Sequence, residues 1–294
     1  MSQLTRLRGA SRPRPTPTSR TESSSLKPHH LPDRLTALPF ALLHLTPLAI
    51  ILTGVDAWSP ALCGGVYLLQ MFGITAGYHR YFAHRSYKTG RAFQFVLAWL
   101  GCSAAQKGPL WWVARHRHRH RTSDTPADLH SPVAHGLWQS HVGWLLSPDS
   151  AATDERSVKD LSRYPELRWL DRFWWTPPLL LAALCLLAGG WAGLVWGFCV
   201  GSLLSHHATF LVNSACHLWG RRRYATPDAS RNNVVVAVLT LGEGWHNNHH
   251  HFQGSAAQSF RWWEVDVSYY VIRLLDAVGL VWDVRQPPPA KVLG

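Results

Sequence analysis

The chain of 294 residues carries little charge and few acidic side chains. Asp, Glu, Lys and Arg make up only 16% of it, and 17 acidic residues stand against 29 basic ones, for a formal net charge of +12. So low a charged fraction is unusual for a soluble domain. The excess of positive charge suits either nucleic acid or an anionic membrane surface, and the positions of the basic residues decide between these two classes of partner.

Paired cysteine motifs are also missing. The chain has five cysteines, all in or beside apolar stretches, and none forms a C-x-x-C pair. This argues against a disulfide framework and against a structural zinc site of the thiolate type, and it favours buried thiols in a reducing compartment. Motifs for a flavin, a haem or an iron–sulfur cluster are absent too. Any redox reaction would therefore need electrons from a separate donor.

The first 34 residues lack an apolar period. They are rich in Arg, Ser, Thr and Pro, so we predict a disordered basic tail. No apolar core of a signal peptide precedes residue 35. An Arg- and Ser-rich start also occurs in organelle transit peptides, although an amphipathic helical pattern is missing. We expect residues 35–285 to form one membrane domain and residues 286–294 a C-terminal tail.

Apolar stretches dominate two parts of the chain. A helix needs about 20 apolar residues to cross a bilayer, and flanking Trp and Tyr residues can extend the shorter stretches. Turns near residues 56–60 and 189–190 join the stretches into two helical hairpins. A fifth stretch, residues 93–105, is too short to span and predicts a re-entrant or interfacial helix. The four candidate spans are residues 38–55, 61–76, 176–187 and 192–212.

The basic residues are segregated along the chain. None of the 29 Lys and Arg residues lies in residues 35–76 or 176–212, so both hairpin turns are predicted to face away from the cytoplasm. The termini and the middle segment would then be cytoplasmic. The sequence thus predicts an all-α, multi-pass integral membrane protein with four transmembrane helices in two hairpins, under a cytoplasmic helical cap. A soluble nucleic-acid binder has no reason for this segregation, and we expect no nucleic-acid partner.

Histidine is abundant, with 18 residues, and many of them are grouped at the predicted cytoplasmic edge of the membrane. Helix positions i, i+3 and i+4 share a face, so members of each group can point at one centre. By the same geometry, His118 points away from His116 and His120. The candidate ligands are His79 and His84; His116 and His120, with His118 as a further possibility; His217; and His246, His249 and His250.

These histidines indicate a metal centre. The H-R-H-R-H-R run on its own would fit a solvated basic face, but several groups at one membrane edge do not. Neutral imidazoles suit iron, copper, zinc and nickel, and eight or nine of them exceed what one ion can use. We therefore expect two ions. Carboxylates commonly orient ligating imidazoles, and Asp124, Asp128 and Glu243 are the candidates for that role.

The spacings resemble those of the membrane fatty-acyl desaturases, and especially the acyl-CoA delta-9 (stearoyl-CoA type) branch, over residues 35–285. That family carries H-x4-H, H-x2-H-H and a second H-x2-H-H. Residues 213–217 are similar to its N-S-x-x-H element, whose Asn holds a metal-bound water, which implies that role for Asn213. The matching residues are His79 and His84; residues 116–120; residues 123–125 and 128–131; residues 140–145; and His246, His249 and His250.

The chain departs from the family pattern at two places. Position 119 should be histidine and is arginine, and a guanidinium cannot ligate a metal. Either His118 substitutes through a distorted helix or one ion loses a ligand, and we favour the lost ligand. A basic pair that meets coenzyme A phosphates is also replaced, by residues 147–149. Lys88, Arg115 and Arg156 are candidates for the acyl-carrier contact instead.

The resemblance implies an oxygen-dependent desaturase that uses two iron ions and O2 to place a cis double bond, expected at delta-9, in a saturated fatty-acyl chain. An acyl-CoA or another acyl carrier, the lipid membrane and an external donor of the ferredoxin or cytochrome b5 type are the implied partners. The expected location is a bacterial inner membrane. A di-iron lipid hydroxylase and a degenerate homologue impaired at Arg119 are the alternatives. Tunnel-wall candidates are Tyr78, Trp138, Trp144 and Trp245.

Overall fold

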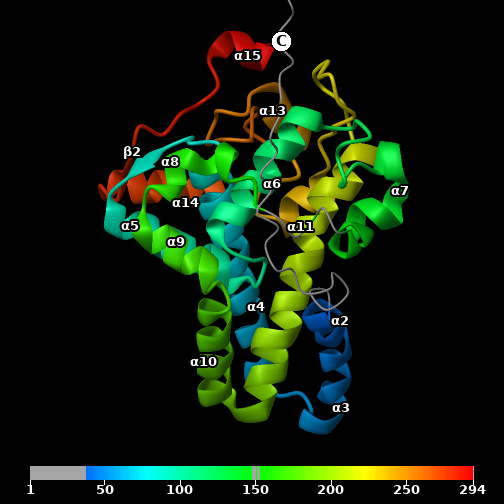
Figure 1. Cartoon of the computed structure of the whole chain (residues 1–294), viewed down its shortest axis with the longest axis vertical. Helices are drawn as coiled ribbons and strands as arrows, with labels where there is room; N and C mark the ends of the chain where they lie inside the picture. Colours follow the sequence, from blue (N-terminus) through cyan, green and yellow to red (C-terminus); the bar gives the residue numbers. More distant parts are fainter. Residues whose placement is uncertain (1–37, 148–149, 151–152, 294) are drawn as a thin grey trace, which may run out of the picture. The chain divides into compact units, whose positions relative to one another are not determined.

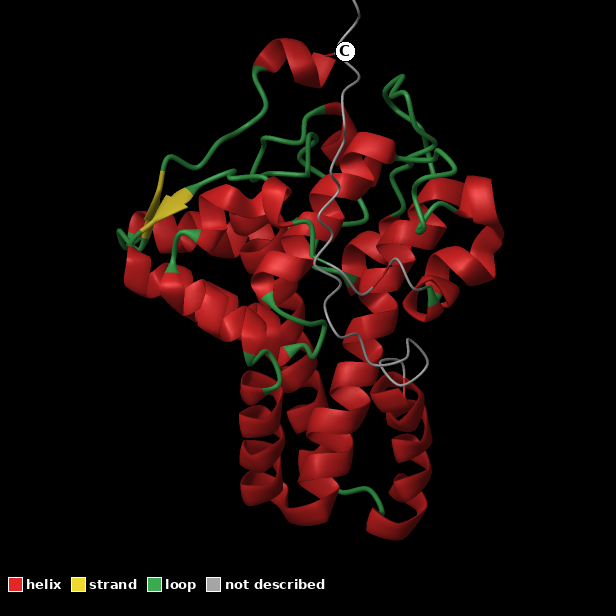
Figure 2. Cartoon of the chain, in the orientation of Figure 1, coloured by secondary structure: helices red, strands yellow, loops and turns green. Residues whose placement is uncertain are grey.

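The computed structural model describes residues 38–147, residue 150 and residues 153–293. The predicted tail of residues 1–34 lies outside the described residues. Within the described part, helices form nearly all of the regular structure (Figure 2). The predicted all-α class is therefore confirmed, with one short exception. β1 (Lys88–Thr89) and β2 (Val281–Trp282) form an antiparallel pair in which Lys88 lies opposite Trp282.

The first apolar stretch forms a short interrupted helix. It consists of α2 (Leu38–Leu45), the 3-10 turn η1 (Thr46–Ala49) and α3 (Ile50–Thr53). It ends at Gly54, whose φ of 68° favours glycine. Asp56 Oδ1 then accepts hydrogen bonds of 2.7 Å from the backbone N and the Oγ of Ser59. This cap reverses the chain within the predicted turn.

The second stretch forms one long helix. It begins as α4 (Trp58–Phe72) and continues without a break as the π-helix η2 (Gly73–Ala83). The predicted end at residue 76 is thus too early, because the helix runs on through the first histidine motif. Residues Trp58–Ala83 are long and apolar enough to cross a membrane.

The third and fourth stretches form a second long apolar run, residues Thr176–Leu218. It contains α10 (Thr176–Ala192), the π-helix η6 (Gly193–Val200) and α11 (Gly201–Leu218). Gly189 (φ −149°) and Gly190 (φ 59°) leave the helical conformation, which only glycine does freely at positive φ. At this break the chain turns back, so that η6 packs against α10 (Figure 1).

Apolar side chains cover the outside of these helices. Ile51 is 84% exposed, Leu52 88% and Leu187 83%, and only 17% of the most apolar window of residues Thr176–Leu218 is buried. Soluble monomers rarely expose apolar patches of this extent. The exposed surface therefore points to membrane association. Among the described residues, two helices pass the length and hydropathy test for a span, and residues Leu38–Thr53 form a shorter apolar helix.

A cap of shorter helices holds the ends of the long ones. The predicted interfacial stretch, residues 93–105, appears as α5 and packs on η2. The closest approach is at Gly73, where a side chain would collide with the backbone of Leu100. The cap helices are α5 (Arg91–Ser103), α6 (Pro109–Thr122), α7 (Pro132–His141), η3 (Gly143–Leu146), η5 (Glu155–Val158), α8 (Lys159–Ser162), α9 (Pro165–Arg172), α12 (Val234–Leu239), α13 (His246–His251), α14 (Val267–Ala277) and α15 (Pro289–Leu293).

Helix α6 is anchored to the end of η2 by an ion-pair network. Arg117 donates to both carboxylate oxygens of Asp160, at 2.8 and 3.0 Å, and to the carbonyl oxygens of Phe82 and Ala83. Arg85 donates to the same Asp160 carboxylate at 2.5 Å. Burial opposes ionisation of Asp160, but the hydrogen bonds from both arginines lower its pKa to about 2. This network fixes the helix that carries the second histidine motif.

Candidate metal centre

The first two histidines are brought together by the π-helix. His84 follows His79 by five positions, a spacing that would place them on different faces of an α-helix. In η2, however, the backbone N of His84 donates to the carbonyl O of His79 at 3.1 Å, which is the i→i+5 bond of a π turn. The wider turn brings both imidazoles to one side, and their ring centroids lie 4.6 Å apart.

Three further histidines complete this group. His116 and His120 lie one turn apart on α6, and His249 lies on α13. The facing nitrogens of all five residues lie within 4.8 Å of one another. Nε2 of His84 is 2.7 Å from Nε2 of His116, and Nε2 of His249 is 3.2 Å from the Nε2 atoms of both His79 and His120. We call His79, His84, His116, His120 and His249 the five-histidine group.

The donor set of the five-histidine group fits one metal ion. Ligands held at about 2.1 Å on all sides of an ion lie up to about 4.2 Å apart, close to the observed spread. Burial lowers the pKa of His84, His116, His120 and His249 well below the usual value, so these imidazoles are neutral and offer lone pairs. Facing lone pairs in a buried space repel one another unless a cation lies between them.

A buried charge network supports this group from behind. Nδ1 of His79 lies 2.5 Å from Glu243 Oε2, so Nδ1–H donates to the carboxylate and Nε2 keeps its lone pair for the centre. Glu243 also pairs with Arg80, which pairs in turn with Asp266 at 2.9 Å. Burial alone would raise the pKa of Glu243, but His79 and Arg80 hold it below its usual value. The predicted orienting role of Glu243 therefore has a direct contact.

The loop before α13 can place Glu243 because two glycines flank it. Gly242 has a φ of 122° and lies against the Asp266 carboxylate. A side chain on Gly244 would meet the backbone of Ala237 and Asn233. Only glycine fits both positions. Following this loop, α13 directs His246, His249 and His250 to one side, while His251 stacks on Tyr224 with ring centroids 4.0 Å apart.

The remaining three candidate ligands form a second cluster. His217 comes from α11, and His246 and His250 come from α13; their facing nitrogens also lie within 4.8 Å of one another. We call these residues the three-histidine group. His217 Nδ1 donates to Asp124 Oδ2 at 2.8 Å, and His250 Nδ1 donates to Asp228 Oδ2 at 2.5 Å. Burial raises the pKa of Asp124, but His217 together with hydrogen bonds from Ala229 and Ser131 lowers that pKa to about 2.

The side chain of Arg119 lies inside the three-histidine group. Its Nη2 is 3.0 Å from Nε2 of His217 and 3.2 Å from Nε2 of His246, and its Nη1 donates to Asn213 Oδ1. Arg119 is only 4% exposed. The donor set here therefore does not fit a second metal ion while the guanidinium is present, because the lone pairs that would ligate it already accept from Arg119.

His118 does not replace the missing ligand. Helix α6 is continuous from Pro109 to Thr122, and His118 belongs to neither histidine group. Its Nε2 lies 3.4 Å from the carbonyl O of Ala127. The structure therefore agrees with the second of the two expectations for position 119, in which a ligand is lost without a substitute. The expected contact between Asn213 and a metal-bound water is replaced by its hydrogen bond with Arg119.

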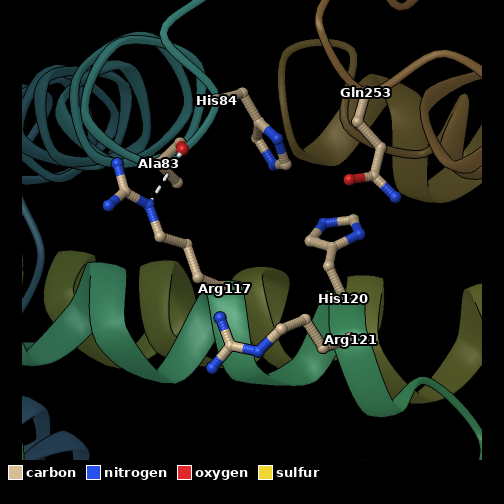
Figure 3. A pocket seen from close by; sticks show the side chains of 6 residues that line it. All are labelled: Ala83, His84, Arg117, His120, Arg121 and Gln253. Atoms are coloured by element: carbon tan, nitrogen blue, oxygen red, sulfur yellow. Dashed lines mark hydrogen bonds between the residues drawn. The ribbon is translucent and has the colours of Figure 1, made fainter. Parts of the chain in front are cut away.

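A cavity of about 260 Å³ reaches the five-histidine group from the cap. His84 and His120 point into it from η2 and α6, and Gln253 faces them from the segment after α13 (Figure 3). Arg117 and Arg121 line the same opening, beside Ala83. Small molecules or electrons thus have a short approach to this group, past two positive charges.

The other predicted site residues occupy diverse surroundings. Tyr78 is fully buried and donates to the carbonyl O of Lys107 at 3.0 Å. Trp144 and Trp245 are also buried. Trp138 is 70% exposed, which does not support its place in a tunnel wall and fits interfacial anchoring better.

The candidate carrier contacts do not share one element. Lys88 pairs with Asp283 at 2.6 Å beside the β1–β2 ribbon, whereas Arg115 lies on α6 and Arg156 on η5. Asp128 contacts no ligand histidine. Its carboxylate accepts from the backbone N of His130 at 3.0 Å and of Asp124 at 3.3 Å, so its part is to shape the loop that presents Asp124.

Sequence reasoning missed two supporting residues. Asp228 holds His250, and Gln258 donates to Glu243 Oε2 at 2.7 Å. Neither lies next to a histidine motif, so spacing gave no signal for them. Asp228 could have been suspected only as a carboxylate in the segment between His217 and His246. The sequence likewise did not predict that Arg119 lies inside the three-histidine group. It indicated only that Arg119 cannot ligate a metal ion.

Comparisons with known proteins agree with this arrangement. Residues 56–273 match the family model for fatty acid desaturases. The chain is 38% identical over 271 residues to the sn-1 stearoyl-lipid 9-desaturase of Anabaena variabilis, covering 90% of this chain and 97% of that protein. It is 41% identical to the acyl-CoA C20 Delta5-desaturase of Anemone leveillei, covering 77% of this chain and 72% of that protein. It is 40% identical to delta-9 acyl-lipid desaturase 1 of Arabidopsis thaliana, covering 77% of this chain and 75% of that protein.

Proposed function

The chain belongs to the fatty acid desaturase family, and on this premise we propose that it uses O2 and iron to introduce a cis double bond into a saturated fatty-acyl chain. The observation that carries the proposal is the convergence of five histidine nitrogens on one centre. Desaturation of an acyl chain removes two hydrogens. Together with one O2, two electrons and two protons from outside, these hydrogens balance as two molecules of water.

Iron, when bound, would supply the oxidising power that no side chain has. The protein's own residues bind and orient. The Glu243 carboxylate holds the Nδ1 proton of His79, which keeps the imidazole in the tautomer that ligates. His79 and His249 are buried, whereas the cavity beside His84 and His120 gives small molecules and electrons access to the centre. The resemblance implies a second iron ion as well, which would require the three-histidine group to accept it in place of the guanidinium.

We propose that residues 35–285 are one multi-pass membrane domain with four spans and cytoplasmic termini. The exposed apolar surfaces of residues Leu38–Thr53, α4 and α10 support it, as does the chain reversal at Gly189–Gly190. The absence of Lys and Arg from residues 35–76 and 176–212 gives the orientation. A bacterial inner membrane is the proposed location, because the Anabaena protein aligns over 97% of its length.

Delta-9 is the proposed position of the double bond. Two of the three relatives described above carry that position in their names, while the Anemone leveillei protein is a Delta5-desaturase. The proposed carrier is coenzyme A, with a lipid-bound acyl chain as the alternative that the delta-9 relatives favour. Lys88, Arg115 and Arg156 are the proposed contacts to a phosphate-bearing head group.

An external electron donor is the other proposed partner. The cavity that reaches His84 and His120 is flanked by Arg117 and Arg121, and the sequence has no motif for an electron-carrying cofactor of its own. A ferredoxin or a cytochrome b5-like protein with an acidic face would be steered to this opening by charge. Association should then weaken as ionic strength rises.

Expression in a host that lacks its own desaturase tests the function. We expect a new monounsaturated acyl chain, identified by mass spectrometry after derivatisation of the double bond, which also gives its position. Free acyl-CoA and membrane lipids are analysed separately to assign the carrier. Hydroxylated chains would favour a lipid hydroxylase instead. No oxidised product, with the protein present in the membrane and a donor supplied, would favour the degenerate homologue.

A further inference from the structure

Arg119 gives this chain a feature that the family resemblance does not imply. We propose that the Arg119 guanidinium takes the place of the second metal ion, so that the folded protein holds a single ion, in the five-histidine group. The inference concerns metal content and goes beyond the proposed desaturation. Its test therefore does not depend on turnover.

Hydrogen bonding is the first argument. Nη2 has two protons and donates to Nε2 of His217 and Nε2 of His246, while Nη1 donates to Asn213 Oδ1. Both imidazoles are set up as acceptors, and for His217 the reason is visible: its Nδ1 proton is committed to Asp124. Three groups from α11 and α13 thus present lone pairs to one fork-shaped cation, whose planar geometry matches such a set.

Space is the second argument. An imidazole nitrogen lies about 2.1 Å from a metal ion that it binds. Arg119 Nη2 lies 3.0 and 3.2 Å from two of the three nitrogens that would have to bind the ion. An ion within reach of these same lone pairs would overlap the guanidinium. The two occupants therefore exclude each other.

Charge is the third argument. Arg119 is buried, and the carboxylates of Asp124 and Asp228 stand behind the imidazoles of the three-histidine group. A guanidinium stays charged in proteins. It thus supplies the positive charge for which these carboxylates would otherwise need an ion.

The guanidinium is also held in place by its helix. Arg119 is 4% exposed, and α6 is anchored on the opposite side by Arg117 and Asp160. To leave, Arg119 would have to abandon three acceptors in a buried space, which is costly for a charged group. The five-histidine group does not share this obstacle: within the part of the chain that the structure describes, its nitrogens face one another and make no hydrogen bond with Arg119.

The experiment counts iron in the full chain. Protein purified in detergent is loaded with excess Fe²⁺ under anaerobic conditions, freed of unbound metal and analysed by mass spectrometry for iron per chain. We expect about one ion for the wild type and about two for Arg119→His, a twofold rise, because the histidine removes the guanidinium and adds a ligand. Arg119→Lys should stay near one, because it keeps the positive charge.

Arg273→His is the matched control. It makes the same substitution on α14, where the Arg273 side chain is 48% exposed and pairs with Asp276, outside both histidine groups. We expect its iron count to equal that of the wild type. If Arg273→His gained an ion as Arg119→His does, the gain would come from an added surface histidine, and the inference would be wrong.

Spectroscopy provides a second measurement. A lone ferric ion gives an EPR signal of half-integer spin, whereas two coupled ferric ions give none, and Mössbauer spectra of ⁵⁷Fe-loaded protein count the environments. We expect the lone-ion signal in the wild type. About two ions per chain with a coupled spectrum in the wild type would overturn the inference and leave the proposed function intact. One ion per chain without unsaturated product would support the inference and contradict the proposed function.

Discussion

The two histidine groups are built from the same materials and differ in one residue. Each takes imidazoles from separate parts of the chain, and each is backed by a buried carboxylate that fixes a tautomer: Glu243 for His79, and Asp124 for His217. In the five-histidine group the lone pairs face one another. In the three-histidine group they face the guanidinium of Arg119. Histidines whose Nδ1 atoms donate to a buried carboxylate therefore do not by themselves make a metal site.

The comparison also shows how a metal site can be altered while the fold is kept. A guanidinium and a metal ion both offer positive charge to neutral imidazoles, so the carboxylates behind them remain paired in either case. What changes is the chemistry. A metal ion can bind oxygen and change its oxidation state, and an arginine can do neither. A single side chain on α6 thus distinguishes the two groups while the fold around them is the same.

The largest expected effect is the loss of a central ligand of the five-histidine group. His249→Ala removes the imidazole that faces both His79 and His120. We expect iron affinity to fall by more than about 100-fold, beyond the range seen for second-layer changes, and desaturation to be lost with it. Iron titration followed by metal analysis measures the first effect.

The matched control is His251→Ala on the same helix. His251 stacks on Tyr224 and lies outside both groups, so iron binding should be that of the wild type. Equal iron loss in both variants would mean that α13 has unfolded, and the assignment of His249 as a ligand would lose its support.

A smaller effect is expected from the carboxylates, and it should separate the two groups. Glu243→Gln weakens the hold on His79 Nδ1, and we expect a 10–100-fold drop in iron affinity, roughly the range for outer-layer partners of ligating histidines. Asp124→Asn makes the same change behind His217. Since His217 holds Arg119 in this structure, iron affinity should change less than about twofold. An equal loss in both variants would contradict the difference between the groups.

The smallest effect is expected at the anchor of α6, outside both groups. Asp160→Asn weakens four hydrogen bonds with Arg85 and Arg117. The Asp160 side chain is 41% exposed, so we expect a loss of only about 1 kcal/mol in unfolding free energy. The iron count should not change. Thermal unfolding in detergent measures the loss. The control is Glu166→Gln, which weakens the exposed ion pair between Arg91 and Glu166.

The pH dependence of this contribution has a definite sign. The folded pKa of Asp160, about 2, lies below its usual value of 3.8. The carboxylate therefore stabilises the fold fully above the usual value, and this stability is lost as the pH falls through about 2. Wild type and Asp160→Asn should thus become equally stable in acid. A difference that persists at the lowest pH would show that packing, rather than charge, holds α6.

Much of the architecture could be predicted from local pattern. Apolar stretches, glycines 189 and 190 and the segregation of basic residues marked the hairpins, because helix length and turn chemistry are local properties. Helical spacing likewise predicted that His116 pairs with His120 and that His118 points away. The pairing of His79 with His84 needed the π-helix η2, whose i→i+5 turn the sequence did not announce.

The sequence by itself determined which residues could ligate, which could not, and that they lie at one edge of an apolar helical protein. Those properties follow from side-chain chemistry and short-range spacing. Tertiary structure alone decided how eight histidines divide into groups of five and three, which carboxylates stand behind them, and where the Arg119 side chain goes. These outcomes depend on contacts between segments up to 170 residues apart, and no local pattern encodes which of those segments will meet.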